Sequence, residues 1–185
     1  MDIKKKILAN GVLLLIAGII AVVMSFDPSP ALQYIFIGVS MTMGVIAFSI
    51  GRQAKNNFVR STYYRWIGFI LFGLAISLSV WATTLAALII VVGFFLLVLG
   101  IVEFVFADQI FHYLTPVSWS LLGVKLVIAT VTTTGAAWIL AMARIDPNIS
   151  LLCLGVLFFV VGLSFIQLGR ITQTFGPGVG ITMNN

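Results

Sequence analysis

The sequence predicts an all-α integral membrane protein, with six transmembrane helices arranged as three repeated helical hairpins. Composition is the first observation: 61% of the 185 residues are hydrophobic, 8% are charged, and the mean hydropathy is +1.20. A soluble domain carries about 25% charged residues, because its surface must stay hydrated. This composition excludes a soluble enzyme and a nucleic-acid-binding protein. Long apolar runs and a repeated glycine pattern are the other two observations.

Prolines and charged residues divide the chain into apolar runs. The first, 7–26, follows Lys4–Lys6 and lacks an A-x-A cleavage motif, so we expect a retained span rather than a signal peptide. The second, 31–50, begins after Pro30 and ends before Arg52. The run 66–106 is about twice the roughly 20 residues that cross a bilayer. It therefore predicts two spans, 66–82 and 85–106, with a tight turn at 81–84.

The last two spans are expected at 118–142, between Pro116 and Arg144, and at 149–169, between Pro147 and Arg170. Residues 171–185 are rich in glycine and polar side chains, and they predict a flexible C-terminal tail. The chain is thus expected to form a single transmembrane domain.

The basic residues predict the orientation of these six spans. Six spans leave Arg144 alone on one side of the membrane and place the other basic residues outside the spans on the opposite side: Lys4, Lys5, Lys6, Arg52, Lys55, Arg60, Arg65 and Arg170. Because cytoplasmic loops carry the excess of Lys and Arg, both termini are expected in the cytoplasm. Tryptophans agree with this division, since Trp66 and Trp81 bracket one span and Trp119 and Trp138 bracket another.

A hairpin of two helices recurs three times. The first helix of each copy has a glycine near its start, at 11, 68 and 123. The second helix carries two glycines, which we expect to face neighbouring helices, since small residues let membrane helices approach closely. These pairs are Gly38 and Gly44, Gly93 and Gly100, and Gly155 and Gly162. The outer turns contain Asp27-Pro28, Thr83-Thr84 and Asp146-Pro147, which suit a helix start.

These features together resemble the HdeD-like acid-resistance membrane proteins. The resemblance covers about residues 8–170 and rests on the glycine-bearing first helices, the proline-containing outer turn and the paired-glycine second helix. Its best local match is Val98-Leu-Gly-Ile-Val-Glu-Phe-Val-Phe-Ala107, which looks like the family's G-h-h-E segment. The resemblance implies a small six-helix protein of the bacterial inner membrane. The third copy departs from the pattern, because Phe165 stands where the second copy has Glu103.

Two ionisable residues, Glu103 and Lys125, fall inside predicted spans, where a charge is costly and marks a candidate site. Three interpretations fit them: separate snorkelling to the interface, an interhelical ion pair, or part of a transport site. Around Lys125, small and polar residues at helical spacing predict a face that points into the bundle: Ser118, Ala129, Thr132 and Ala136.

The sequence contains no recognisable catalytic or metal-binding motif, and we expect neither an enzyme nor a cofactor. His112 is expected to be a solvated interfacial residue, and Cys153 a buried small side chain. The resemblance implies a non-enzymatic role in acid or general stress resistance, through membrane lipids, a protein partner or a homo-oligomer. The alternative is a small transporter or channel, with a polar path near Lys125 and the threonines at 130, 132, 133 and 134.

Overall fold

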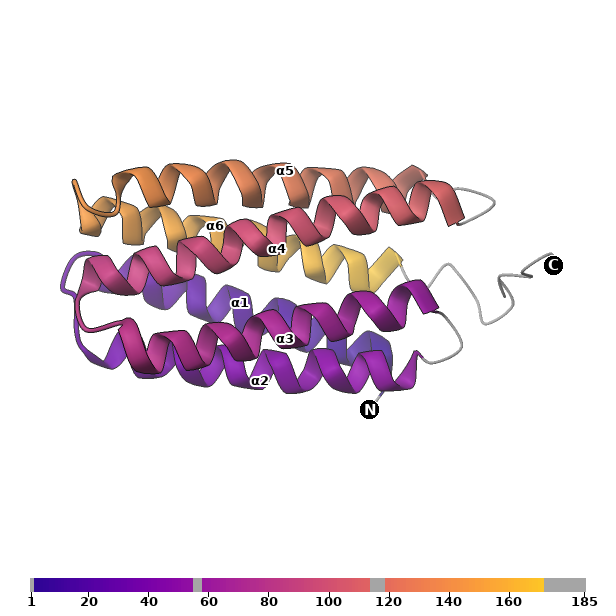
Figure 1. Cartoon of the computed structure of the whole chain (residues 1–185), viewed down its shortest axis with the longest axis horizontal. Helices are drawn as coiled ribbons and strands as arrows, with labels where there is room; N and C mark the ends of the chain where they lie inside the picture. Colours follow the sequence, from indigo (N-terminus) through magenta and orange to yellow (C-terminus); the bar gives the residue numbers. More distant parts are fainter. Residues whose placement is uncertain (1, 55–57, 114–118, 172–185) are drawn as a thin grey trace.

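The computed structural model describes residues 2–54, 58–113 and 119–171, which form six α-helices and no β-strand. The helices lie side by side along the long axis of the molecule (Figure 1). Their bounds are α1 Ile3–Met24, α2 Ala31–Gln53, α3 Phe58–Trp81, α4 Leu85–Tyr113, α5 Trp119–Met142 and α6 Pro147–Ile171. The predicted all-α fold with six spans is confirmed.

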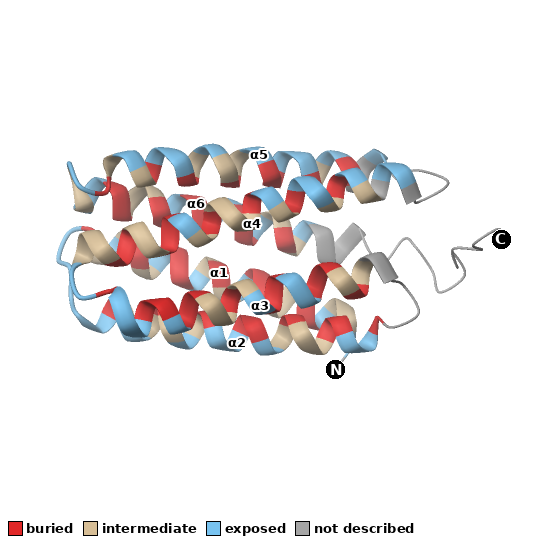
Figure 2. Cartoon of the chain, viewed as in Figure 1, coloured by how far each residue is buried: buried red, intermediate tan, exposed pale blue. Residues whose placement is uncertain are grey.

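Each of the six helices is long and apolar enough to cross a membrane. Large apolar side chains are exposed on the outer face of every helix, among them Val23, Val45, Phe69, Ile101, Val127 and Val156. Buried residues lie on the faces that point inward (Figure 2). A helix that is apolar on both its inner and outer faces is typical of a membrane span, because lipid replaces water around the bundle.

Two helices extend well beyond the expected spans. Helix α3 begins at Phe58 rather than near 66, and α4 continues to Tyr113 rather than ending near 106. Arg60 and Arg65 precede the apolar run of α3, and Asp108 follows that of α4. None of them breaks its helix, because Arg is a good helix former and Asp costs less than about 1 kcal/mol in a helix. Ile171, the first residue of the predicted C-terminal tail, belongs to α6. Residues 172–185 lie outside the described ranges, as do Lys55, Pro116 and Ser118.

Short turns join the helices at the end of the bundle opposite the start of α1. The turn predicted at 81–84 lies between Trp81 and Leu85. Thr84 caps α4, because its Oγ1 accepts a hydrogen bond from the Ala87 amide at 3.1 Å, and Asp146 caps α6 through the Ile149 amide at 3.0 Å. Asp27 does not cap α2, which begins four residues later at Ala31 after the N-cap residue Pro30.

The helices form a closed ring in chain order, with α6 returning to α1. The most extensive contacts join α1 to α6, α2 to α3 and α4 to α5, whereas the two helices of each predicted hairpin contact each other less. Extensive and lesser contacts therefore alternate three times around the ring, as a threefold rotation of one repeated unit requires. The tight interfaces lie between hairpins rather than within them.

Glycines line these tight interfaces. A Cβ added at Gly18 would stand 2.7 Å from the Gly155 carbonyl oxygen, and one at Gly11 would stand 2.9 Å from that of Gly162. Such distances leave no room for a side chain, so the backbones of α1 and α6 are in direct contact. Of the other predicted glycines, Gly44 faces Phe72 on α3 at 3.2 Å, Gly93 faces Leu140 on α5 at 3.1 Å, and Gly100 faces the Thr133 amide nitrogen at 3.0 Å.

The packing role predicted for Gly38 is wrong. No atom of another element lies within 4 Å of the position that its Cβ would occupy, and the residue is exposed. The glycine that shares a face with Gly44 is Gly51, whose added Cβ would stand 3.1 Å from the Ser61 carbonyl oxygen. A spacing of six residues turns roughly 120° away around a helix, whereas seven residues return to within about 20° of the same face.

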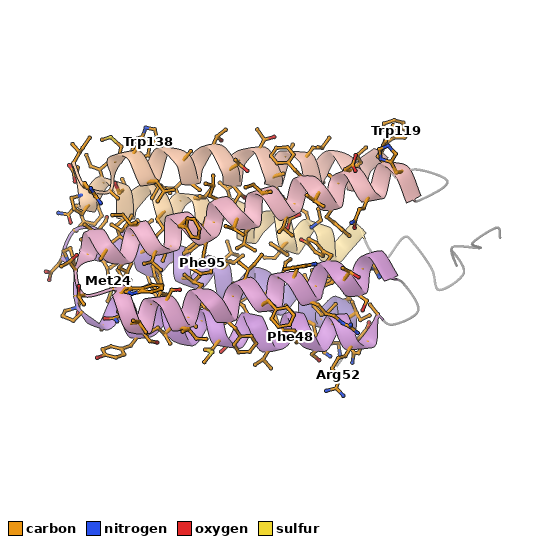
Figure 3. All side chains as sticks on the ribbon, in the orientation of Figure 1. Met24, Phe48, Arg52, Phe95, Trp119 and Trp138 are labelled. Atoms are coloured by element: carbon orange, nitrogen blue, oxygen red, sulfur yellow. The ribbon has the colours of Figure 1, made fainter. Side chains whose placement is uncertain are left out.

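Tryptophans stand on the outer surface of the bundle. Trp66, Trp81, Trp119 and Trp138 are all exposed. Trp119 and Trp138 lie near opposite ends of α5 and point away from the other helices (Figure 3). This is the arrangement of two interfacial aromatic belts.

Candidate functional site

Glu103 on α4 and Lys125 on α5 lie in direct contact inside the bundle. The Lys125 ammonium nitrogen is 2.8 Å from Glu103 Oε2, with 1% of Lys125 and 4% of Glu103 exposed. This distance makes a charge-assisted hydrogen bond, which is stronger than one between neutral groups. In this geometry neither side chain reaches out to an interface.

A tyrosine that sequence analysis missed completes the site. The Tyr63 hydroxyl on α3 accepts a hydrogen bond from the Lys125 ammonium at 2.6 Å and donates one to Glu103 Oε1. Both carboxylate oxygens and the phenol oxygen are thereby engaged, and three helices are joined through one network. We call Tyr63, Glu103 and Lys125 the buried triad.

Aromatic rings pack against Tyr63 and Lys125 of the triad. The Tyr63 ring stacks on Phe106 with centroids 3.9 Å apart, and the Lys125 nitrogen lies 5.2 Å from the Phe106 centroid and 5.7 Å from that of Phe165. Ring faces carry partial negative charge and attract a cation. Phe165 stands at the position of the third copy that matches Glu103 in the second copy. Its ring lies near the Lys125 ammonium.

The position of Tyr63 follows from the length of α3. Because α3 begins at Phe58, Tyr63 lies inside the helix, where Ser61, Tyr63 and Tyr64 all point into the bundle. The segment was expected to be a connection, since Arg60 and Arg65 flank it. Buried residues at helical spacing with Ile67 and Leu71 are the signal by which the tyrosine could have been found.

A small cavity of about 70 Å³ adjoins the triad on the axis of the bundle. Glu103, Thr132 and Ser40 are its polar or charged lining residues, and the rest of its wall is apolar. All six helices contribute to it, through residues such as Leu14, Met43, Leu71, Leu96, Ile128 and Phe158. Of the triad, Glu103 alone lines this cavity, and it is the charged residue in a wall that is mostly apolar.

The threonines of α5 do not share one face. Thr132 is buried and lines the cavity, whereas Thr133 packs against Gly100 of α4. Thr130 and Thr134 are exposed, and the Thr134 hydroxyl donates to the Thr130 carbonyl oxygen of its own helix at 2.7 Å. The four side chains therefore do not line a common polar path.

The other sequence candidates lie away from the triad. His112 is exposed in the last turn of α4, with its Nδ1 3.2 Å from the Asp108 carboxylate. Cys153 on α6 is half-buried and makes no disulfide. Within the described ranges, no group of three or more His, Cys, Asp or Glu side chains is placed to hold a metal ion.

Both polar residues of a second interhelical contact were also missed by sequence analysis. Lys6 on α1 is buried, with 8% of the residue exposed. Its ammonium donates a hydrogen bond to Ser49 Oγ on α2. Lys6 was counted among the basic residues outside the spans, because the first span was expected to begin at 7, whereas α1 begins at Ile3.

Comparisons with known proteins found no family model, no curated protein and no solved structure that matches this chain.

Proposed function

We propose that this chain is a non-enzymatic protein of the bacterial inner membrane, of the HdeD-like type. In this proposal both termini are cytoplasmic, and the protein supports resistance to acid or general stress through the bilayer or through a protein partner. The three glycine-bearing hairpins and the segment around Glu103 support the resemblance. The buried triad is the observation that carries the proposed mode of action.

The triad favours a structural brace over a reactive site. A general base or nucleophile needs a free oxygen or nitrogen that meets a substrate. Here both Glu103 oxygens are hydrogen-bonded within the triad, and Lys125 is almost fully buried against two aromatic rings. We therefore infer that these residues hold α3, α4 and α5 together and that the outer surface of the bundle carries the function.

Transport is the alternative, and the side-chain positions of α5 argue against it. A transporter generally groups several polar side chains around a site near the middle of the membrane. Thr130 and Thr134 face outward, and the cavity beside Glu103 is almost entirely apolar. An ion would find few oxygen ligands along this interior.

The stress role is tested by survival of bacteria after a shift to acidic medium. Cells that lack their own copy of the gene would carry the wild-type protein or the Gly18→Leu, Gly155→Leu double variant, in which α1 and α6 cannot pack. We expect survival with wild type to exceed survival with the variant, at equal membrane expression. Equal survival of the two strains would refute the proposed role.

Transport is tested separately with purified protein in liposomes that contain a pH-sensitive dye. Under an imposed pH or potassium gradient we expect the same leak as in protein-free liposomes. A flux that Lys125→Met abolishes would replace the proposal with the transporter alternative. Co-purification in mild detergent would then show whether a stoichiometric partner accompanies the protein.

A further inference from the structure

A groove on the outer surface of the bundle lies over α2 and α3, near the end of the molecule where α1 begins. Its volume is about 590 Å³, and it is lined by Val45, Phe48, Ser49, Arg52, Gln53 and Phe72. Polar residues from the last turns of α2 form one part of the groove. The remaining part is formed by two phenylalanines and a valine that stand further along the membrane-spanning segments.

The polar part of the groove is positively charged. Arg52 is exposed and extends away from the bundle, close to the groove residue Phe48 on the same helix (Figure 3). The Lys6 ammonium on α1 does not line the groove itself, but it donates a hydrogen bond to the groove residue Ser49 and so brings a second positive charge next to it. None of the residues that line the groove is acidic.

Lys6 keeps donor capacity for a further acceptor. An ammonium group can donate three hydrogen bonds, and Lys6 forms no ion pair with a carboxylate among the residues that the structure describes. It also lies in the first turn of α1, which contains no acidic residue. The exposed N-cap residue Asp2 stands beside the partial positive charge at the start of α1 but forms no ion pair with Lys6. The buried ammonium therefore still favours a further anion.

The apolar part of the groove is shaped by aromatic packing. Phe48 lies edge-on to Phe69 at 4.9 Å between centroids and tilted against Phe72 at 5.5 Å. Gly68 has room for the Phe48 ring only because it lacks a side chain, since an added Cβ would stand 2.8 Å from a ring carbon. These rings fix an apolar surface beside the two cations, on the face of the bundle that meets lipid.

We propose that this groove binds one anionic phospholipid. The phosphate lies between Arg52 and the Lys6–Ser49 contact, and an acyl chain runs over Phe48 and Phe72. Charge complementarity selects an anionic lipid over a zwitterionic one, because an ammonium in the headgroup would stand beside the protein's own cations. Basic pockets at the ends of membrane helices bind acidic headgroups by the same electrostatics.

Native mass spectrometry of the full-length protein in detergent tests this site. The protein is titrated with phosphatidylglycerol, or with phosphatidylcholine that carries the same acyl chains. We expect wild type to retain the anionic lipid more tightly, by about fivefold for each basic residue that contacts it. Arg52→Gln and Lys6→Met should each reduce this preference by about fivefold.

Lys5→Gln is the matched control, because it removes the same charge from an exposed residue at the same end of the bundle. It should leave the preference unchanged. Equal retention of both lipids by wild type, or an equal effect of Lys5→Gln and Arg52→Gln, would overturn the proposal. Arg52→Gln keeps the test valid even if Lys6→Met fails to fold, since Arg52 is exposed.

Two further measurements identify any other occupant of the groove. Soluble glycerol 3-phosphate should not displace the lipid, because it lacks an acyl chain for the aromatic surface. Displacement would indicate a site for free phosphate and would refute lipid binding. A dimer that disappears in Arg52→Gln would identify a second copy of the chain as the occupant and would refute it as well.

Discussion

Lys125 illustrates how a membrane bundle holds a full charge in its interior. With 1% of the residue exposed, its ammonium depends on Glu103 and Tyr63 for the hydrogen bonds that water would otherwise supply. Sequence analysis left three interpretations of Glu103 and Lys125 open: separate snorkelling, an interhelical ion pair and a transport site. Tyr63 escaped sequence analysis because the residues before 66 were expected to form a connection, although Tyr63 stands at helical spacing from Ile67 and Leu71.

Breaking the ion pair on one side should be costlier than removing both charges. We expect Glu103→Gln and Lys125→Met each to lower the free energy of unfolding by about 3–5 kcal/mol, because each leaves one buried charge unpaired. The double variant should recover much of this loss, since no charge then remains. Unfolding in detergent, followed for all four proteins, gives the coupling energy. Strictly additive losses would show that the two residues act separately.

Tyr63→Phe isolates the contribution of the phenol hydroxyl. The variant keeps the stacking on Phe106 but removes the donor to Glu103 Oε1, and hydrogen bonds to charged groups contribute about 1.5–3 kcal/mol. We expect a loss of that size in the same unfolding measurement. Tyr64→Phe is the matched control, because Tyr64 is equally buried but its hydroxyl does not bond to Glu103 or Lys125. A comparable loss in both variants would contradict a specific role for Tyr63.

At the scale of the helix, the apolar runs located every span but not every helix end. Hydropathy reports the part of a helix that lies in hydrocarbon, whereas backbone hydrogen bonding continues wherever the chain can maintain it. Helices α3 and α4 therefore extend about two turns past their apolar runs, to Phe58 and Tyr113. The prolines and the turn at Thr83-Thr84 were better guides to where helices begin and end. Proline acts on the backbone itself, because it fixes φ and lacks an N–H.

Glycine spacing shows where a sharper reading of the sequence was possible. The pairs that face a neighbouring helix are seven residues apart: Gly11 and Gly18, Gly44 and Gly51, Gly93 and Gly100, Gly155 and Gly162. Gly38 stands six residues before Gly44, and helix geometry alone excludes both from one face. Which helix each face meets was not available from spacing, because any of several neighbours satisfies the same pattern.

Gly162→Leu and Gly38→Leu should separate these two kinds of glycine. At Gly162 the new side chain would force α6 away from Gly11 and Leu15 on α1, and we expect a marked loss of thermal stability in detergent. At Gly38 a leucine would point outward, and its better helix propensity should leave stability unchanged or slightly raised. Melting curves of both variants beside wild type give the answer. Equal melting of wild type and Gly162→Leu would place this glycine against lipid.

For the molecule as a whole, the sequence repeat predicted three equivalent units, and the alternating contacts around the ring agree with that. The repeat did not predict which interfaces are tight. Connections at the end where α1 begins join the extensively packed pairs α2–α3 and α4–α5, and the third such pair, α1–α6, has no connection. The unit that packs is therefore offset by one helix from the unit that repeats in sequence.

Orientation in the membrane is a prediction at this scale. The start of α1 and the end of α6 lie at the same end of the bundle (Figure 1), and the excess of basic residues predicts that this end is cytoplasmic. Reporter fusions at Asn185 and after Ser29 should therefore report opposite compartments, with Asn185 in the cytoplasm. The same compartment for both would refute the topology.

The unconnected contact between α1 and α6 gives the protein an order of assembly during synthesis. The glycine face of α1 is synthesised before the other five described helices, whereas its partner on α6 is synthesised after them. Until α6 is inserted, the first five helices cannot form a closed ring, and the central cavity lacks the residues that α6 contributes to its lining. Insertion of α6 closes the ring of six helices. A chain interrupted before α6 would therefore leave the glycine face of α1 exposed to other membrane segments.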